Sequence, residues 1–319
     1  MAIGEFALIG NYFTGIGPRS AAVALGIGDD CALLEPPAGN QLAISADALV
    51  AGVHFPLRGA AYDIAQKALR TNLSDLAAMG AAPLAFTLAL TLPDADENWL
   101  TGFSNGLRAC ANEFALPLIG GDTTRGPHLV IAIQIIGIVP HGAALTRAGA
   151  QSGDSIFVSG TLGDARAALD CLDQPEHVLS AAQRYCLQRY HRPSPRIALG
   201  CELRGLASAA IDVSDGLAAD LGHILERSAV GAQIDVAALP LSEALRAHPD
   251  AAEFALHGGD DYELCFTAPA RNRAAVIDTA RALAVPLAEI GRIVAAPGLY
   301  RHGANGEMLP LAQDGYRHF

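Results

Sequence analysis

Lysine is nearly absent from this chain of 319 residues: of its 21 basic residues only Lys67 is a lysine, and the others are arginines. No GxxxxGK[ST] motif occurs, so a phosphate loop of that type is excluded. A protein of this composition that handles phosphate must use metal ions, backbone N–H groups and arginine. Runs of basic residues are also missing and the net charge is −12, which argues against nucleic acids and anionic membranes as partners.

Cysteine pairs and targeting segments are missing as well. Six scattered cysteines without a CxxC motif predict small buried side chains of a reduced protein and no zinc site. Residues 1–14 carry Glu5 and no basic segment, so we expect no secretory signal. The longest apolar run, 129–139, contains Gln134 and is far shorter than the ~20 residues that span a bilayer. These features predict a soluble, cytoplasmic protein.

The composition that remains is that of a folded protein with a sizeable core, at 51% hydrophobic and 17% charged residues. The length predicts two domains or one large one. Apolar periodicity predicts helices that alternate with strands in both halves, which indicates an α/β or α+β class. Residues 140–154 have glycine and proline and little periodicity, so we divide the chain into domains 1–148 and 149–319. The predicted helices are 5–13, 62–79, 96–114, 165–172, 180–190, 196–203, 217–227 and 274–283, and the predicted strands are 22–25, 41–45, 83–92, 116–119, 129–139, 155–159, 207–211 and 290–294.

Acidic residues follow five of the apolar runs, and four of these places have a glycine adjacent. Ligands of an open α/β sheet gather where its strands end, so these acids are expected to converge. Converging carboxylates repel one another unless cations neutralise them, which predicts several divalent ions. Oxygen-only ligands favour Mg²⁺. The alternative for each acid is a helix cap or a turn, and Asp215 is a cap candidate in either case. The acids are Asp29/Asp30, Asp47, Asp122, Asp212/Asp215 and Asp260/Asp261/Glu263.

Three further features bear on the chemistry. Glycines at 120 and 121, before Asp122, allow the backbone to approach a ligand closely. Asp75, between Leu73 and Leu76 of a predicted helix, is either solvated or a buried ligand, and periodicity leaves both open. The segment Asp212–Gly216 opens a helix whose free N–H groups favour a phosphate, with a metal ion between that phosphate and the acids.

Taken together, these motifs resemble the thiamine-monophosphate kinase family of the aminoimidazole-ribonucleotide-synthetase-like superfamily, over nearly the whole chain and in the same order. The resemblance implies two α/β domains: an N-terminal mixed sheet with helices that forms a homodimer, and a C-terminal α/β sandwich. It also implies ATP bound through several Mg²⁺ ions and the conversion of thiamine phosphate to thiamine diphosphate. The motifs are Gly28-Asp29-Asp30, Ile44–Asp47, Asn72–Gly80, Gly120–Pro127, Asp212–Gly216 and Gly258–Glu263.

The resemblance further implies roles for single residues. The implied metal ligands are Asp30, Ser45, Ala46, Asp47, Asp75, Asp122, Asp212 and Asp215. The implied ATP contacts are Gly121, Asp122, Arg147 and Ser214, and the implied contacts to thiamine phosphate are His54, Glu263 and Phe319. Two residues depart from the family pattern: Ala46 lacks the usual hydroxyl and leaves only its carbonyl, and Asn105 replaces a frequent aromatic nucleotide contact. Residue type alone favours a loop histidine at His54 and a frayed terminus at Phe319.

The expected reaction is direct, Mg²⁺-assisted in-line phosphoryl transfer from ATP. A phosphate monoester has a second pKa near ~6, so the acceptor is mostly dianionic at neutral pH and no general base is expected. Alternatives remain: aminoimidazole-ribonucleotide synthetase and selenophosphate synthetase within the superfamily, a metal-dependent phosphohydrolase, and a non-catalytic nucleotide- or metal-binding protein. Selenophosphate synthetase usually needs an N-terminal cysteine and a lysine, and the first 25 residues contain neither.

Overall fold

The structure is a computed structural model that describes residues 4–302 and 307–316. The chain divides into two compact units, Met1–Leu76 with Ala81–Gly142, and Ala77–Gly80 with Ala143–Phe319. Each unit combines helices with a mixed sheet, which confirms the predicted α/β class. The division after residue 148, with ATP binding and dimerisation assigned to the first domain, stays a prediction.

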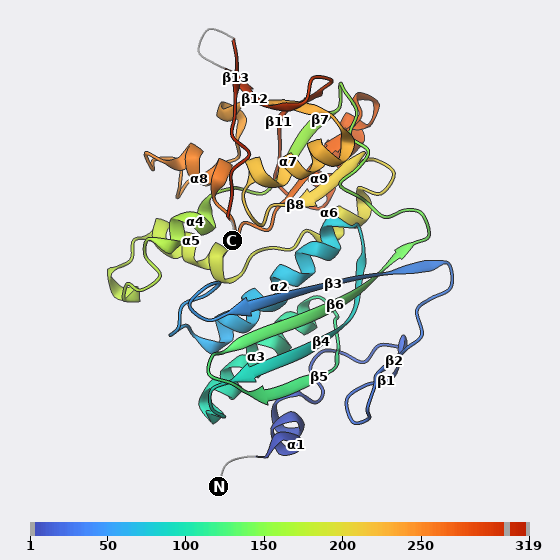
Figure 1. Ribbon diagram of the computed structural model, residues 1–319, viewed down its shortest axis with the longest axis vertical. Helices are drawn as coiled ribbons and strands as arrows, with labels where there is room; N and C mark the ends of the chain where they lie inside the picture. The colour runs from blue at the N-terminus through green and yellow to red at the C-terminus, as the bar shows by residue number, and fades with distance from the viewer. Residues whose placement is uncertain (1–3, 303–306, 317–319) are drawn as a thin grey trace. The chain divides into compact units, whose positions relative to one another are not determined.

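The first unit is built on a four-stranded sheet in the order β3-β6-β4-β5 (Figure 1). Its neighbours pair antiparallel except for β4 and β5, which are parallel. Its elements are α1 (Glu5–Leu8), the π-helix η1 (Ile9–Phe13), β1 (Val23–Leu25), β2 (Leu33–Leu34), β3 (Asn40–Val50), α2 (Ala61–Ala78), β4 (Ala82–Leu92), α3 (Glu97–Glu113), β5 (Leu118–Arg125) and β6 (Val130–Pro140).

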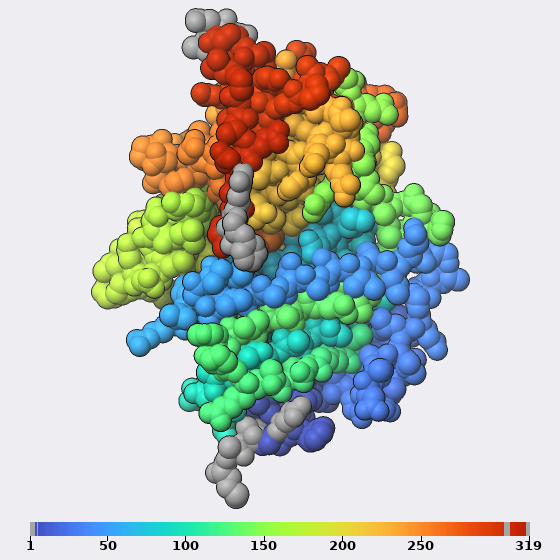
Figure 2. Space-filling view, in the orientation of Figure 1, coloured from blue at the N-terminus to red at the C-terminus, as the bar shows by residue number. Residues whose placement is uncertain are grey.

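Small residues let the two long helices of this unit pack closely. A Cβ on Gly137 of β6 would lie 2.8 Å from a methyl group of Leu76, which brings α2 onto the sheet. A Cβ on Gly106 would lie 2.4 Å from the Tyr62 carbonyl, which brings α3 against α2. The opposite face is partly uncovered: Leu42 and Ile44 of β3 are 44% and 58% exposed, and atoms of β3 and β6 form the surface in Figure 2.

Two strands of this sheet are longer than predicted. Strand β3 continues through Asp47 to Val50, and β5 continues through Gly120, Gly121 and Asp122 to Arg125. The prediction that these acids follow the ends of their strands is therefore wrong. Both are edge strands, where one side of the backbone is open and polar or glycine residues cost less than in a central strand.

The second unit contains a seven-stranded sheet in the order β13-β12-β9-β11-β7-β10-β8, antiparallel except for the pair β12 and β9. Its elements are β7 (Ser155–Ser159), α4 (Asp164–Leu169), η2 (Glu176–Val178), α5 (Ala181–His191), α6 (Ile197–Glu202), β8 (Ala209–Asp212), α7 (Leu217–Ser228), β9 (Gly231–Ile234), η3 (Val236–Ala238), α8 (Ala251–His257), β10 (Leu264–Ala268), η4 (Ala270–Asn272), α9 (Arg273–Ala282), β11 (Leu287–Val294), β12 (Gly298–His302) and β13 (Met308–Pro310).

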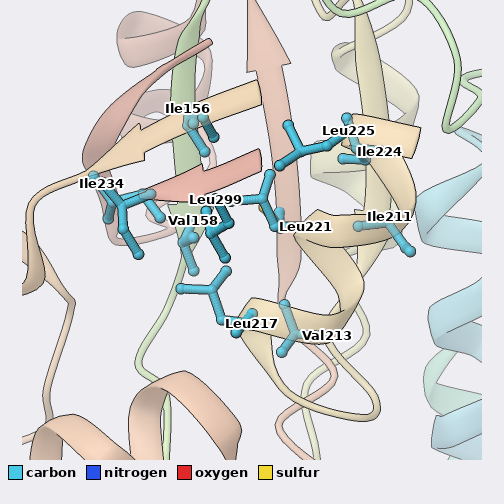
Figure 3. Packing of buried hydrophobic residues seen from close by; sticks show 14 of the residues in the cluster. Ile156, Val158, Ile211, Val213, Leu217, Leu221, Ile224, Leu225, Ile234 and Leu299 are labelled. Atoms are coloured by element: carbon cyan, nitrogen blue, oxygen red, sulfur yellow. The ribbon is translucent and has the colours of Figure 1, made fainter. Parts of the chain in front are cut away.

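Helices cover both faces of this sheet, because its central strands are apolar on both sides. Along β7, Ile156 and Val158 belong to one buried cluster and Phe157 to another. Leu217 and Leu221 of α7 fill the first cluster, as Figure 3 shows. Helices α6 and α9 contribute to the second. This arrangement confirms the predicted C-terminal α/β sandwich. None of the helices in the described part of the chain is long and apolar enough to cross a membrane.

Candidate active site

Three predicted site residues of the first unit meet between β3 and α2. The Ser45 hydroxyl donates a hydrogen bond to Asp75 Oδ2 at 2.6 Å, and the Asp47 N–H donates to the Asn72 side-chain oxygen at 3.2 Å. Asp75 is half-buried on the side of α2 that meets β3. Burial, and then the nearby Asp75 carboxylate, raise the pKa of Asp47 to about 6. Two carboxylates and a hydroxyl thus share a partly dehydrated position where a cation is favourable.

A pocket of about 690 Å³ lies elsewhere in this unit. Two predicted motifs line it, the loop Gly28–Asp30 and the β5 segment Gly120–Asp122, and Phe6 and Phe13 add an apolar wall. Gly121 has φ 147°, and a Cβ there would lie 1.8 Å from the Leu88 carbonyl oxygen. Only glycine fits this backbone, and the strand therefore passes the pocket with its main chain exposed to a ligand.

The structure separates Asp122 from the group around Asp47. Asp47 pairs in register with Ile133, whereas Asp122 pairs with Ala89, which belongs to the neighbouring row of the same sheet. Adjacent rows point to opposite faces, and Asp122 accordingly lines the pocket together with Asp30. Among the described residues no three His, Cys, Asp or Glu side chains come close enough together to hold a metal ion. Within the first unit, the described structure does not bring Asp47 and Asp122 into one site, and the role of the acids as metal ligands stays a prediction.

His54 follows β3 and is held by the end of that strand. Its Nδ1 accepts a hydrogen bond from the Val50 N–H at 3.0 Å, so the neutral ring carries its proton on Nε2. Ala46 lies on the same strand and is exposed. Contacts of His54 to a substrate and of the Ala46 carbonyl to a metal stay predictions.

In the second unit, Asp220 of α7 organises the loop Val213–Gly216. Its Oδ2 accepts the N–H groups of Ser214 and Asp215 at 3.0 Å and of Gly216 at 3.1 Å. Burial raises the pKa of Asp220 to about 7, although these N–H groups act in the opposite direction. The N–H groups of these three loop residues are therefore not available to a phosphate, whereas phosphate binding at the first turn of α7 stays a prediction. Asp215 is not the cap, since the N-cap residue is Gly216.

The motif Gly258–Glu263 lies beside this loop. The Asp260 N–H donates to the Ser214 carbonyl and the Tyr262 N–H to the Val213 carbonyl, both at 2.8 Å. Asp260 and Tyr262 both have positive φ, at 68° and 51°, a conformation uncommon for residues other than glycine. The structure thus brings together two motifs that are far apart in the sequence, and Asp212, Ser214 and Asp215 lie at their junction.

Comparisons with known proteins agree with this arrangement. Two family models match, one described as AIR synthase related protein, N-terminal domain, over residues 28–139, and the other as AIR synthase related protein, C-terminal domain, over residues 151–303. Thiamine-monophosphate kinase of Escherichia coli (strain K12) is 51% identical over 323 residues, covering 100% of this chain and 99% of the relative. The chain belongs to the thiamine-monophosphate kinase family.

Solved structures of the family have the same fold. Thiamine-monophosphate kinase from Stenotrophomonas maltophilia K279a has a TM-score of 0.84 at 50% identity, covering 91% of this chain and 93% of that one. A structure described as AaThiL complexed with AMPPCP and TMP has a TM-score of 0.80 at 30% identity, covering 89% of each chain.

Glu263, a predicted substrate contact, is fully buried in an ion-pair network. Arg196 binds it with two hydrogen bonds, at 2.6 and 2.7 Å, Arg189 donates at 2.7 Å, and the Ser159 hydroxyl donates at 2.6 Å. In the described structure these groups occupy its carboxylate. A direct contact of Glu263 to thiamine phosphate stays a prediction.

The network continues to two further buried acids. Asp164 accepts hydrogen bonds from the Thr161 and Ser242 hydroxyls, at 2.6 and 2.5 Å. Asp261 accepts the Gly163 N–H at 2.7 Å, and burial raises its pKa well above the ordinary value. Sequence reasoning missed these partners because they come from separate segments.

Two predicted residues remain. Arg147 is exposed, and its carbonyl accepts the Ser228 hydroxyl at 3.3 Å. Its contact to ATP stays a prediction. Phe319 lies outside the described residues. Asn105, which the sequence sets apart from the family, is exposed on α3.

Proposed function

We propose that this chain transfers the γ-phosphoryl group of ATP to thiamine phosphate, giving ADP and thiamine diphosphate. The similarity to a relative solved with AMPPCP, an ATP analogue, and TMP carries this proposal, since it extends over 89% of both chains at 30% identity. The full-length similarity to the Escherichia coli kinase supports it further. The pocket with Gly121 and Asp122 has the glycine backbone and the acid that a metal-bound nucleotide needs.

Several Mg²⁺ ions are part of the proposal. The proposed donors are oxygen atoms only, and burial, together with the nearby Asp75 carboxylate, raises the pKa of Asp47. This chemistry fits Mg²⁺. When bound, Mg²⁺ supplies charge neutralisation of the triphosphate and of the transferred group. The residues that would hold the ions are Asp30, Ser45, Ala46, Asp47, Asp75, Asp122, Asp212 and Asp215.

The protein groups bind and orient the two anionic substrates. Gly121, Asp122, Arg147 and Ser214 would contact ATP, and His54, through Nε2–H, would donate to an acceptor on thiamine phosphate. Since the acceptor phosphate is mostly dianionic above pH ~6, no side chain has to remove a proton from it. The transfer is therefore direct and in-line, without a phosphoenzyme.

A homodimer formed through the N-terminal sheets belongs to the same proposal. The apolar side chains of Leu42 and Ile44 on β3 are exposed, and their strand pairs with β6. An uncovered apolar sheet face of this kind marks an interaction site. Sedimentation at micromolar concentration should give twice the mass of the chain, and a monomer at that concentration would contradict this part.

Acceptor comparison tests the reaction itself. The protein is incubated with ATP and Mg²⁺ and with either thiamine phosphate or free thiamine, and the products are separated by chromatography. We expect thiamine diphosphate from the monophosphate only. ATP loss without thiamine diphosphate would indicate a phosphohydrolase, and ATP binding without turnover a non-catalytic protein. Either result rejects the proposal.

The stereochemical course tests direct transfer. With ATP made chiral at the γ-phosphorus, a single in-line displacement inverts the configuration, whereas a phosphoenzyme formed and consumed in two displacements retains it. We expect inversion. Retention would overturn the direct mechanism and leave the overall reaction unaffected.

A further inference from the structure

The carboxylate of Asp220 lies inside the loop that carries Ser214 and Asp215. It is 2% exposed, one turn into α7, and a single oxygen accepts three consecutive backbone N–H groups. These N–H groups belong to the three residues that precede the first residue of α7, Leu217. They point inward, to one internal acceptor.

The orientation of these N–H groups fixes three peptide planes. In a trans peptide the carbonyl points away from the N–H of the following residue, so the carbonyls of Val213, Ser214 and Asp215 point outward. Each outward carbonyl has a different backbone partner. Val213 accepts the Tyr262 N–H at 2.8 Å, and Ser214 accepts the Asp260 N–H at 2.8 Å. Asp215 accepts the Tyr316 N–H at 3.0 Å.

Glycines make these close approaches possible, which is a second and independent observation. A Cβ on Gly259 would lie 2.4 Å from the Ser214 carbonyl oxygen, and a Cβ on Gly315 would lie 2.5 Å from that of Asp215. On the loop itself, a Cβ on Gly216 would lie 2.9 Å from the His257 backbone. Both outer segments therefore pack against carbonyls whose direction Asp220 sets.

We propose that Asp220 is a positioning residue that, by binding three peptide N–H groups, orients the carbonyls that hold the segment 258–263 and the C-terminal segment at Tyr316 against the Val213–Gly216 loop. In consequence the loop before α7 presents the side chains of Ser214 and Asp215 to a ligand and withholds the N–H groups of residues 214–216. The link to catalysis rests on the proposed function, whereas the positioning itself does not.

Hydrogen exchange measured by mass spectrometry on the full chain tests the positioning. In Asp220→Ala the three N–H groups lose their acceptor, and we expect amide exchange to become at least about tenfold faster in peptides that contain Asp260, Tyr262 and Tyr316. Asp220→Asn keeps an oxygen at the same place, so its amide exchange rates should stay within about threefold of those of the wild type. Peptides from β7, in the core of the same unit, should not change.

Asp96 provides the matched control. Its carboxylate also accepts two N–H groups at a helix start, those of Asn98 and Trp99, but it lies in the other unit and outside every predicted motif. Asp96→Ala should leave the peptides with Asp260 and Tyr316 unchanged. Unchanged exchange in Asp220→Ala, or equal acceleration in Asp96→Ala, overturns the proposal.

Two further measurements keep the test decisive. If Asp220→Ala does not fold, Asp220→Asn is compared with Asp220→Glu, whose longer side chain displaces the oxygen. We expect the amide groups to stay protected from exchange in Asp220→Asn and to lose protection in Asp220→Glu, and the reverse order overturns the proposal.

For the catalytic link, we expect the folded variant with faster exchange to have a KM for thiamine phosphate, or a Mg²⁺ concentration at half-saturation, about tenfold above that of the wild type. If exchange is faster in Asp220→Ala but the wild-type protein forms no thiamine diphosphate, the positioning role stands and only the proposed function is rejected.

Discussion

Ser45 of β3 and Asp75 of α2 are joined by a hydrogen bond of 2.6 Å from the serine hydroxyl to the carboxylate. This bond brings an acid from the helix to the position of Asp47, which is partly buried on the strand beside it. Two carboxylates, those of Asp47 and Asp75, thus lie close to each other. The first two predictions follow from this arrangement.

The pKa of about 6 at Asp47 makes the stability of the metal-free protein depend on pH. The folded chain keeps this proton to higher pH than the unfolded chain, whose pKa is 3.8. The stabilisation is therefore complete below pH 3.8 and is lost as pH rises through about 6, and it amounts to at most about 3 kcal/mol. In EDTA at pH 7.5, Asp47→Asn should be more stable to urea than the wild type, with little difference at pH 4.

The exposed Asp94 is the control, since the difference in stability between Asp94→Asn and the wild type should be the same at both pH values. A lower stability of Asp47→Asn at pH 7.5, or an equal difference at both pH values, would contradict the assignment.

Mg²⁺ should stabilise the wild type and have little effect on the variant. A ligand that binds only the folded chain adds about 2.7 kcal/mol at one hundred times its dissociation constant. In thermal unfolding at pH 7.5 we expect the melting temperature to rise with Mg²⁺ in the wild type and much less in Asp47→Asn. An equal rise in both proteins would show that Asp47 does not bind the ion.

Gly120 and Gly121 provide a matched pair on β5. A Cβ at Gly121 would overlap the Leu88 carbonyl and the residue has positive φ, whereas a Cβ at Gly120 meets nothing within 4 Å. Gly121→Ala should lower the free energy of unfolding by at least about 2 kcal/mol and weaken ATP binding at least about tenfold. Gly120→Ala should change the free energy of unfolding by no more than about 0.5 kcal/mol. Urea unfolding and calorimetric titration with ATP·Mg measure both quantities, and equal effects at the two positions would refute this reading of β5.

Loss of Arg196 should expose the cost of burying Glu263. In Arg196→Ala the fully buried carboxylate keeps one charged partner among the described residues, Arg189, and we expect the free energy of unfolding to fall by about 3–5 kcal/mol. The double variant Arg196→Met with Glu263→Gln removes both charges and should recover part of that loss. If Arg196→Ala lowers the free energy of unfolding by less than about 1 kcal/mol, the ion pair of Arg196 and Glu263 does not have the structural role described.

The sequence predicts most of the helices and strands because their local features are strong. Helix α3 begins where Asp96 caps it, and α5 begins with a capping box of Ser180 and Gln183. Five strands, β2, β9, β10, β12 and β13, were missed because runs of two to five residues have too little periodicity. The ends of β3 and β5 were misplaced because acids and glycines, read as turn residues, are tolerated in edge strands.

The site was predictable in its motifs but not in their connections. The match of motif order to a family identifies Asp47, Asp75 and Asp122 as candidates, yet only the register of the sheet shows that Asp122 lies in a different row from Asp47. The pairing of Arg189 with Glu263 joins residues 74 apart in the chain, and no local pattern indicates it. The sequence places Asp220 in a predicted helix and gives no further indication of its role.

Phosphorus NMR of one reaction mixture tests the central claim most directly. The protein, ATP, Mg²⁺ and thiamine phosphate are followed together, so that both substrates and all phosphorus-containing products are observed at once. We expect one ADP and one thiamine diphosphate for each ATP consumed, with no inorganic phosphate beyond the enzyme-free control. ADP formed together with an equal amount of inorganic phosphate, while thiamine phosphate stays unchanged, would contradict it.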